Sequence, residues 1–92
     1  PEWLEDLLLE DDYMGEEEEE EFDYDYFWED FYEALDSLPE RQREVFVLNE
    51  MEGLTLQEIA ELKGEKLKTV ISRKGYAVRK LRDLMDAWAE MV

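Results

Sequence analysis

The charged residues of this chain are distributed so unevenly that only its second part is expected to fold. Residues 1–36 carry 18 acidic and no basic side chains, a net charge of −18, whereas residues 37–92 carry 10 of each, a net charge of zero. Residues 16–21 are all glutamate, and like charges in such a run repel one another and resist compaction. We therefore expect an acidic, disordered arm over residues 1–26 and one folded domain over residues 27–92.

The apolar residues from position 24 onward recur at the three- and four-residue spacing of amphipathic helices. In the first predicted helix they are Tyr24, Phe27, Trp28, Phe31, Leu35 and Leu38. The aromatic residues of this segment, which are Tyr24, Phe27, Trp28, Phe31 and Tyr32, could instead stack on nucleobases. Their spacing and the acidic residues around them favour the hydrophobic core. We expect Trp88 and Met91, near the other end of the chain, to pack on this helix rather than face a partner.

Capping signals and glycines divide the remaining sequence into three further helices. Two pairs have the spacing of a capping box at a helix start: Ser37 with Glu40, and Thr55 with Glu58. Gly53 and Gly64 are expected to end the second and third helices in the left-handed conformation, and the fourth helix begins at about Leu67. No segment alternates between apolar and polar residues as a strand would, so the sequence predicts an all-α domain of four helices without a β wing.

The composition excludes several classes of function. The chain has no cysteine and no histidine, which excludes disulfides, the usual zinc sites and imidazole catalysis. Its carboxylates are not accompanied by a nucleophile with a partner, a phosphate-binding loop or a calcium-binding loop. No apolar run is long enough to cross a membrane, and no signal peptide is visible. We expect a cytoplasmic protein that is not an enzyme and needs no cofactor.

The third and fourth predicted helices have the layout of a helix-turn-helix, with Gly64 in the turn. Their contact should bury six residues, which are Ile59, Ala60, Leu62, Leu67, Val70 and Ile71. Between residues 63 and 82 there are eight basic residues and one acidic residue, Glu65, which gives a net charge of +7. Such cations often form only the solvated face of a helix, but here they follow a capped helix and a glycine turn, which favours DNA binding.

Four segments give the chain a resemblance to a known family. LPERQREVFVL at residues 38–48, GLTLQEIAE at 53–61, TVISR at 69–73 and AVRKLR at 77–82 resemble, in their order and spacing, region four of bacterial RNA polymerase sigma factors of the extracytoplasmic-function type. The resemblance extends over about residues 29–86. It implies a domain that reads the minus-35 promoter element in the major groove of duplex DNA and holds the β-flap of the RNA polymerase core. It adds an anti-sigma factor as a further partner.

The resemblance also implies roles for individual side chains. Those expected to read bases are Lys68, Thr69, Ser72, Arg73, Lys74 and Tyr76. Those expected to hold phosphates are Arg41, Arg43, Arg79, Lys80 and Arg82. Arg41 and Arg43 could equally form ion pairs within their own helix. The acidic residues available there are Glu40, Glu44 and Glu50.

Three residues depart from the pattern of the family. Ile71 stands where many relatives carry a basic residue, so one base contact is expected to be absent. Lys66 replaces the Ser or Thr that often caps the recognition helix. Gly75 interrupts the exposed face of this helix, where it either lets the backbone approach DNA or has no effect. Ile71 and the acidic arm favour an alternative function, a protein-interaction module that binds polymerase or an anti-sigma factor without reading DNA.

The resemblance does not include region two, the part of a sigma factor that melts the promoter. We expect the chain to be the carboxyl-terminal part of a longer factor, with residues 1–26 as a linker, rather than a free-standing relative. The acidic arm could compete with DNA for the basic residues at 63–82, because tethering makes even a weak contact effective. A solvated linker without contacts is the simpler interpretation, and the one we favour.

Overall fold

The computed structural model describes residues 23–89 of the chain, which are helical and contain no β-strand. The α-helices are α2 (Tyr24–Asp36), α3 (Glu40–Phe46), α4 (Leu56–Lys63), α5 (Leu67–Leu84) and α6 (Asp86–Ala89), and the π-helical segment η1 (Val47–Met51) continues α3. Most of the predicted arm, and Met91, lie outside the described residues. The prediction of an all-α helix-turn-helix domain is confirmed for the part of the chain that the structure describes.

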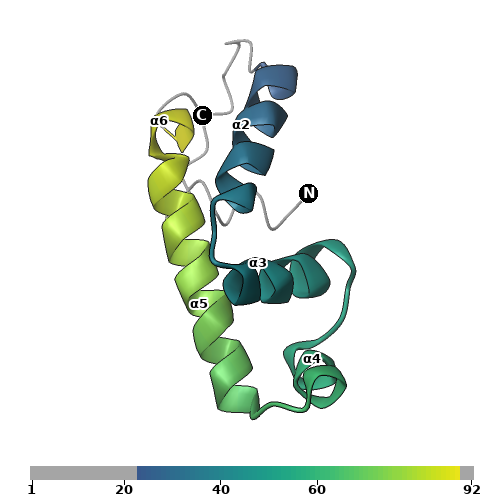
Figure 1. Ribbon diagram of the computed structural model, residues 1–92. Helices are drawn as coiled ribbons and strands as arrows, with labels where there is room; N and C mark the ends of the chain where they lie inside the picture. The colour runs from purple at the N-terminus through teal and green to yellow at the C-terminus, as the bar shows by residue number, and fades with distance from the viewer. Residues whose placement is uncertain (1–22, 90–92) are drawn as a thin grey trace.

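The longest helix, α5, forms the axis along which the other helices are packed (Figure 1). α2 lies beside the C-terminal half of α5, α3 crosses near its middle, and α4 lies near its N-terminal end. α6 continues α5 at the opposite end of the molecule. α4 and the N-terminal half of α5 therefore occupy the end of the domain that α2 leaves uncovered (Figure 1).

Two hydrophobic clusters hold the helices on α5. The larger cluster joins α2 and α3 to the C-terminal half of α5 and consists of Phe27, Phe31, Ala34, Leu35, Leu38, Phe46, Ala77, Leu81 and Met85. The smaller cluster joins α3 and α4 to the N-terminal half of α5 and consists of Val45, Ile59, Ala60 and Val70. Because the neighbouring residues Val45 and Phe46 of α3 enter different clusters, this short helix ties the helix-turn-helix to the rest of the domain.

The end of the described chain packs on the first helix, as predicted, through Trp88. Its ring meets that of Phe27 edge to face, with the ring centroids 5.5 Å apart. Its Nε1 donates a hydrogen bond to Asp30 Oδ2 at 2.8 Å. Phe27 and Phe31 are fully buried, whereas the core prediction is wrong for Tyr24, in the first turn of α2, and for Tyr32, which are 62% and 49% exposed. Burial therefore begins one turn later in this helix than the spacing of its apolar residues predicts.

One of the two predicted capping boxes is present. At the start of α4, Thr55 Oγ1 accepts a hydrogen bond from Glu58 N at 3.0 Å, and Glu58 Oε1 accepts one from Thr55 N at 2.9 Å. The prediction at Ser37 is wrong, because this residue ends α2 with helical backbone angles and its Oγ donates to Ala34 O at 2.7 Å. An N-cap needs a non-helical backbone, and here Pro39, with φ −55° and ψ 145°, supplies it without a side-chain bond.

The glycines predicted to end helices both have the left-handed conformation, with φ of 84° at Gly53 and 68° at Gly64. The second predicted helix is divided between α3 and η1. In η1 the hydrogen bonds reach one residue farther back than in an α-helix, as in the bond from Glu52 N to Val47 O at 3.0 Å.

None of the helices in residues 23–89 has both the length and the apolar composition that a membrane span requires.

Candidate nucleic-acid interface

The turn between α4 and α5 is fixed by backbone hydrogen bonds around Gly64. Gly64 N donates to Glu61 O at 3.3 Å, and Glu65 N donates to Ala60 O at 2.9 Å, which together form a Schellman motif. The motif requires a left-handed residue, and Gly64, with φ 68° and ψ 35°, provides it without a Cβ penalty. α5 begins directly after Lys66, which makes no side-chain capping bond. The direction of α5 relative to α4 is thus set by the backbone of the turn.

The buried contact between α4 and α5 is narrower than the sequence predicts. Ile59, Ala60 and Val70 are buried, as predicted, with exposed fractions of 0%, 3% and 0%. The prediction is wrong for three residues, Leu62, Leu67 and Ile71, which are 64%, 38% and 49% exposed. Leu62 lies on α4, whereas Leu67 and Ile71 lie on α5. Because a helix as short as α4 covers only a narrow stripe of α5, apolar residues of either helix that lie outside this contact face solvent.

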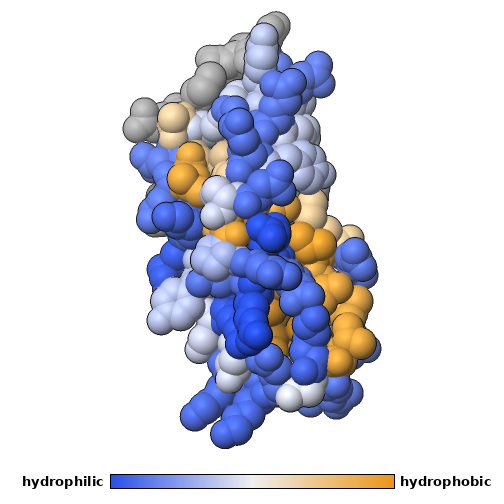
Figure 2. Space-filling model, viewed as in Figure 1, coloured by the Kyte–Doolittle hydropathy of each residue, from blue (hydrophilic) through white to orange (hydrophobic). Residues whose placement is uncertain are grey.

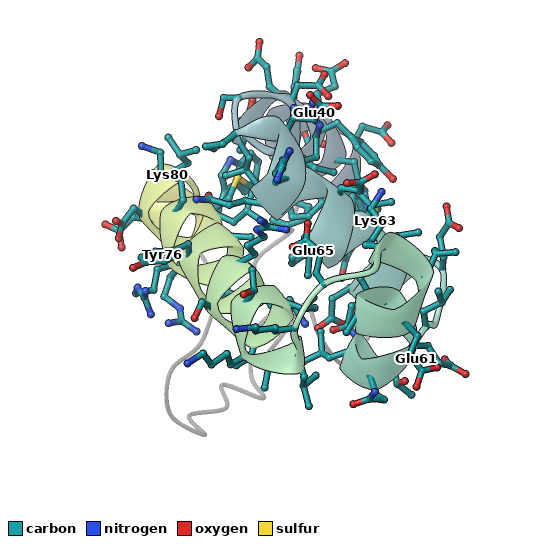
Figure 3. All side chains as sticks on the ribbon, turned by 60° about the horizontal axis from the view of Figure 1, so that its bottom comes forward. Glu40, Glu61, Lys63, Glu65, Tyr76 and Lys80 are labelled. Atoms are coloured by element: carbon teal, nitrogen blue, oxygen red, sulfur yellow. The ribbon has the colours of Figure 1, made fainter. Side chains whose placement is uncertain are left out.

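The side of α5 opposite its buried residues carries polar and basic side chains. Six residues predicted to contact DNA lie on or beside this side: Lys68, Thr69, Ser72, Tyr76, Arg79 and Lys80. Thr69 is half-buried and the other five are exposed. Figure 3 shows Tyr76 and Lys80 projecting from the same side of α5. The guanidinium of Arg79 stacks over the Tyr76 ring, 4.9 Å from its centroid. Figure 2 shows this part of α5, at the lower left, as mainly hydrophilic. We call these six residues the outer face of α5.

Lys74, also predicted to read bases, points from α5 toward η1 rather than along the outer face. Its Nζ donates hydrogen bonds to Glu50 Oε2 at 2.8 Å and to Asn49 Oδ1. It lies 5.9 Å from the centroid of the Phe46 ring, and only 15% of its side chain is exposed. The structure therefore places the Lys74 ammonium between two helical segments, where it holds them together.

Arg73 and Arg41 are brought to one carboxylate, that of Glu65. Arg73 Nη1 lies 2.6 Å from Glu65 Oε1, and Arg41 Nη1 lies 3.8 Å from Glu65 Oε2. About a quarter of the Arg73 and Glu65 side chains is exposed, compared with 71% for Arg41. Figure 3 shows Glu65 between α3 and α5, on the side of α5 away from Tyr76. The sequence identified Glu65 only as the single acidic residue of the basic stretch and did not predict these partners.

The remaining predicted phosphate contacts are Arg43, on α3, and Arg82, near the C-terminal end of α5. Arg43 Nη1 donates to the backbone carbonyls of Asp36 and Leu38, each at 3.0 Å. Carbonyls at the end of a helix lack intrahelical partners, so Arg43 satisfies groups that the fold would otherwise leave to water. Arg82 is half-buried in the last turn of α5.

Two of the acidic residues that were considered as partners of Arg41 and Arg43 instead form ion pairs with other helices. Glu44 pairs with Lys63 of α4 at 2.6 Å, and Glu50 pairs with Lys74 of α5 at 2.8 Å.

Comparison with known proteins gives a matching family model and a similar relative, both on the basis of sequence. The family model described as Sigma-70, region 4 matches residues 28–81, which run from α2 into the last turns of α5. The RNA polymerase sigma factor SigV of Bacillus subtilis (strain 168) is 43% identical to the chain over 53 residues. These residues are 58% of this chain and 32% of the relative, so the chain spans about a third of the relative's length. No solved structure gives a significant match.

Proposed function

This chain belongs to the sigma-70 region 4 family, and from that membership we propose that it binds promoter DNA as part of an RNA polymerase sigma factor. The family consists of DNA-binding transcription domains rather than enzymes. In this proposal α5 enters the major groove at the minus-35 element, and α4 braces it on the DNA backbone. The main support is the outer face of α5, whose hydrogen-bonding and cationic side chains follow the glycine turn and lie opposite the buried residues Val70, Ala77 and Leu81.

The outer face suggests a division between base readers and phosphate contacts. In helix-turn-helix proteins the first turns of the recognition helix meet the base edges. We therefore assign base reading to Lys68, Thr69, Ser72, Arg73 and Tyr76. Phosphate contacts are assigned to the cations around these residues, Arg41, Arg79, Lys80 and Arg82. In this assignment Lys74 and Arg43 contribute to DNA binding only indirectly, because their N–H groups already donate hydrogen bonds to η1 and to the end of α2.

The contact with polymerase is a second part of the proposal. We propose that residues 27–92 also bind the β-flap of the polymerase core, and that residues 1–26 link them to the remainder of a longer factor. Apolar residues are exposed at the helix-turn-helix, at Leu62, Leu67 and Ile71, and Figure 2 shows an apolar area beside α4. This exposure favours the second candidate function, a module that binds polymerase or an anti-sigma factor through region 4 and does not read DNA.

One experiment distinguishes the two candidate functions: the full chain is titrated with a pool of randomised promoter-length duplexes over a series of salt concentrations. A DNA reader enriches one sequence, and the logarithm of its affinity falls with the logarithm of salt concentration by about 0.9 per phosphate contacted. Lys68→Ala should weaken binding to the enriched duplex. Its matched control is Lys63→Ala, because Lys63 lies on α4 in an ion pair with Glu44 and points away from the outer face (Figure 3).

Each result of this experiment favours one candidate. An enriched sequence, together with a larger loss for Lys68→Ala than for Lys63→Ala, supports DNA reading by the outer face. Equal losses for the two variants contradict the assignment of Lys68. The absence of binding at low salt supports the protein-interaction module, and the isolated β-flap is then the ligand to titrate.

A further inference from the structure

We infer that Glu65 is a specificity-determining residue of this interface, because it positions Arg73 and restrains Arg41 before DNA arrives. The inference rests on the proposed function, since it concerns the same meeting of α5 with DNA. Glu65 itself is not assigned a contact with a base or a phosphate. Its proposed role is to determine which contacts with DNA the two arginines can make.

The backbone of Glu65 is held in place on both sides. Its N–H closes the Schellman motif by donating to Ala60 O at 2.9 Å. The next residue, Lys66, accepts the first backbone bonds of α5, from Thr69 N at 3.0 Å and from Val70 N at 3.2 Å. A side chain that leaves from this turn therefore has a fixed origin relative to α4 and to α5.

The carboxylate of Glu65 joins two arginines from different helices. Oε1 lies 2.6 Å from Arg73 Nη1, a charge-assisted hydrogen bond, while Oε2 faces Arg41 Nη1 at 3.8 Å. The bond to Oε1 occupies one of the five N–H donors of the Arg73 guanidinium. The other donors can still bind a base edge, but the planar group is held in one orientation. An arginine oriented in this way loses less conformational freedom on binding than a solvated one.

The negative charge of the Glu65 carboxylate also weakens contacts in which a DNA phosphate is held only by the positive charge of an arginine. A phosphate that approaches Arg73 or Arg41 meets the negative charge of Glu65, and at Arg73 it must also compete with the hydrogen bond that this carboxylate already accepts. A base edge carries no formal charge and needs only the donors in a fixed direction. Glu65 is therefore expected to weaken binding to arbitrary sequences more than binding to the preferred one, in a stretch whose net charge is otherwise strongly positive.

The test is Glu65→Gln in the full chain, with the enriched duplex and a scrambled duplex of the same length. The variant should bind the scrambled duplex more tightly, with a salt slope steeper by up to about 0.9 for each arginine that gains a phosphate. The affinity ratio between the two duplexes should fall. The largest fall expected is the roughly 5- to 150-fold discrimination that one well-placed bidentate side chain supplies.

The matched control is Glu61→Gln, which removes the same charge from the neighbouring helix. Glu61 accepts a hydrogen bond from Gln57 Nε2 at 3.0 Å and points away from α5 in Figure 3. A general change of net charge would affect both variants alike. A second control repeats Glu65→Gln in the Arg73→Ala background, where the loss of discrimination should be smaller because only the effect through Arg41 remains. Thermal unfolding of all variants by circular dichroism shows that they remain folded.

The outcomes separate this inference from the proposed function. If the unsubstituted chain shows no preference between the duplexes, the proposed function fails, and the inference with it. If the chain does discriminate but Glu65→Gln behaves as Glu61→Gln does, DNA reading stands and the inference is overturned. It is also overturned if Glu65→Gln lowers discrimination equally with and without Arg73. A loss that is smaller without Arg73, together with a steeper salt slope on scrambled DNA, supports it.

Discussion

Replacement of Gly64 by alanine is expected to destabilise the domain through backbone conformation alone. Gly64 has φ 68° and ψ 35°, a region that costs an L-residue roughly 1–2 kcal/mol. A Cβ built at this position has no neighbouring atom within 4 Å, so the substitution adds neither a clash nor a packing contact. The free energy of unfolding should therefore fall by about 1–2 kcal/mol. In a domain of this size each kcal/mol corresponds to roughly 4–8 °C in Tm.

The matched control is the same chemical change at Gly75, inside α5. Gly75 is not among the glycines with positive φ, and a Cβ there would lie 3.7 Å from Arg79 Nη1, an ordinary van der Waals distance. Alanine is the better helix former by about 0.8–1 kcal/mol, so Gly75→Ala should stabilise the domain. The two Gly→Ala variants should thus differ by about 2–3 kcal/mol, with opposite signs relative to the unsubstituted chain.

Urea unfolding followed by tryptophan fluorescence measures both changes, because Trp28 and Trp88 pack against the larger hydrophobic cluster. If both variants shift the free energy of unfolding in the same direction, the backbone explanation for Gly64 is wrong. Duplex binding by Gly75→Ala then resolves the two interpretations of that residue. A stabilised variant that loses DNA affinity shows that the backbone at Gly75 approaches DNA closely, and an unchanged affinity shows that the glycine has no such role.

Three further substitutions test single features of the fold. Thr55→Ala removes the capping box of α4 and should lower the free energy of unfolding by about 0.5–2 kcal/mol in urea titrations. Ser37→Ala has the same spacing in the sequence but removes no cap, so an equal loss in both variants would contradict the assignment of Ser37 to the end of α2. Lys74→Met leaves Glu50 and Asn49 without their cation and should destabilise the domain by about 1–3 kcal/mol, measured in the same way. The ratio of the affinities of Lys74→Met for the enriched and the scrambled duplex should equal that of the unsubstituted chain. A lower ratio would instead identify Lys74 as a base reader.

Much of the fold could be predicted from residues that lie close together in the chain. The helices, the left-handed Gly53 and Gly64 and the capping box at Thr55 depend on interactions that span at most a few positions. The pairing of α4 with α5 follows from the short turn around Gly64, and the basic stretch after it indicates a DNA-binding face. The burial of Leu62 was predicted wrongly, because the width of a helix contact depends on where the partner helix lies.

The candidate site shows where the sequence alone is insufficient. Ser72, Arg73 and Lys74 are consecutive polar residues, yet their surroundings differ because each residue of a helix turns by about 100° from the one before. Ser72 faces outward, Arg73 turns to Glu65, and Lys74 reaches η1, where its partners Glu50 and Asn49 lie 24 and 25 positions earlier in the chain.

The sequence by itself determined the class of the domain, the approximate positions of its main helices and the stretch that carries its cations. Only the tertiary structure decided which cations are engaged within the fold. Arg43 provides the example, since its donors bind the carbonyls of Asp36 and Leu38. Every residue has such carbonyls, so no residue type in the sequence marks them as partners. Local conformation depends on neighbours along the chain, whereas the availability of a charged side chain depends on atoms that only folding brings within reach.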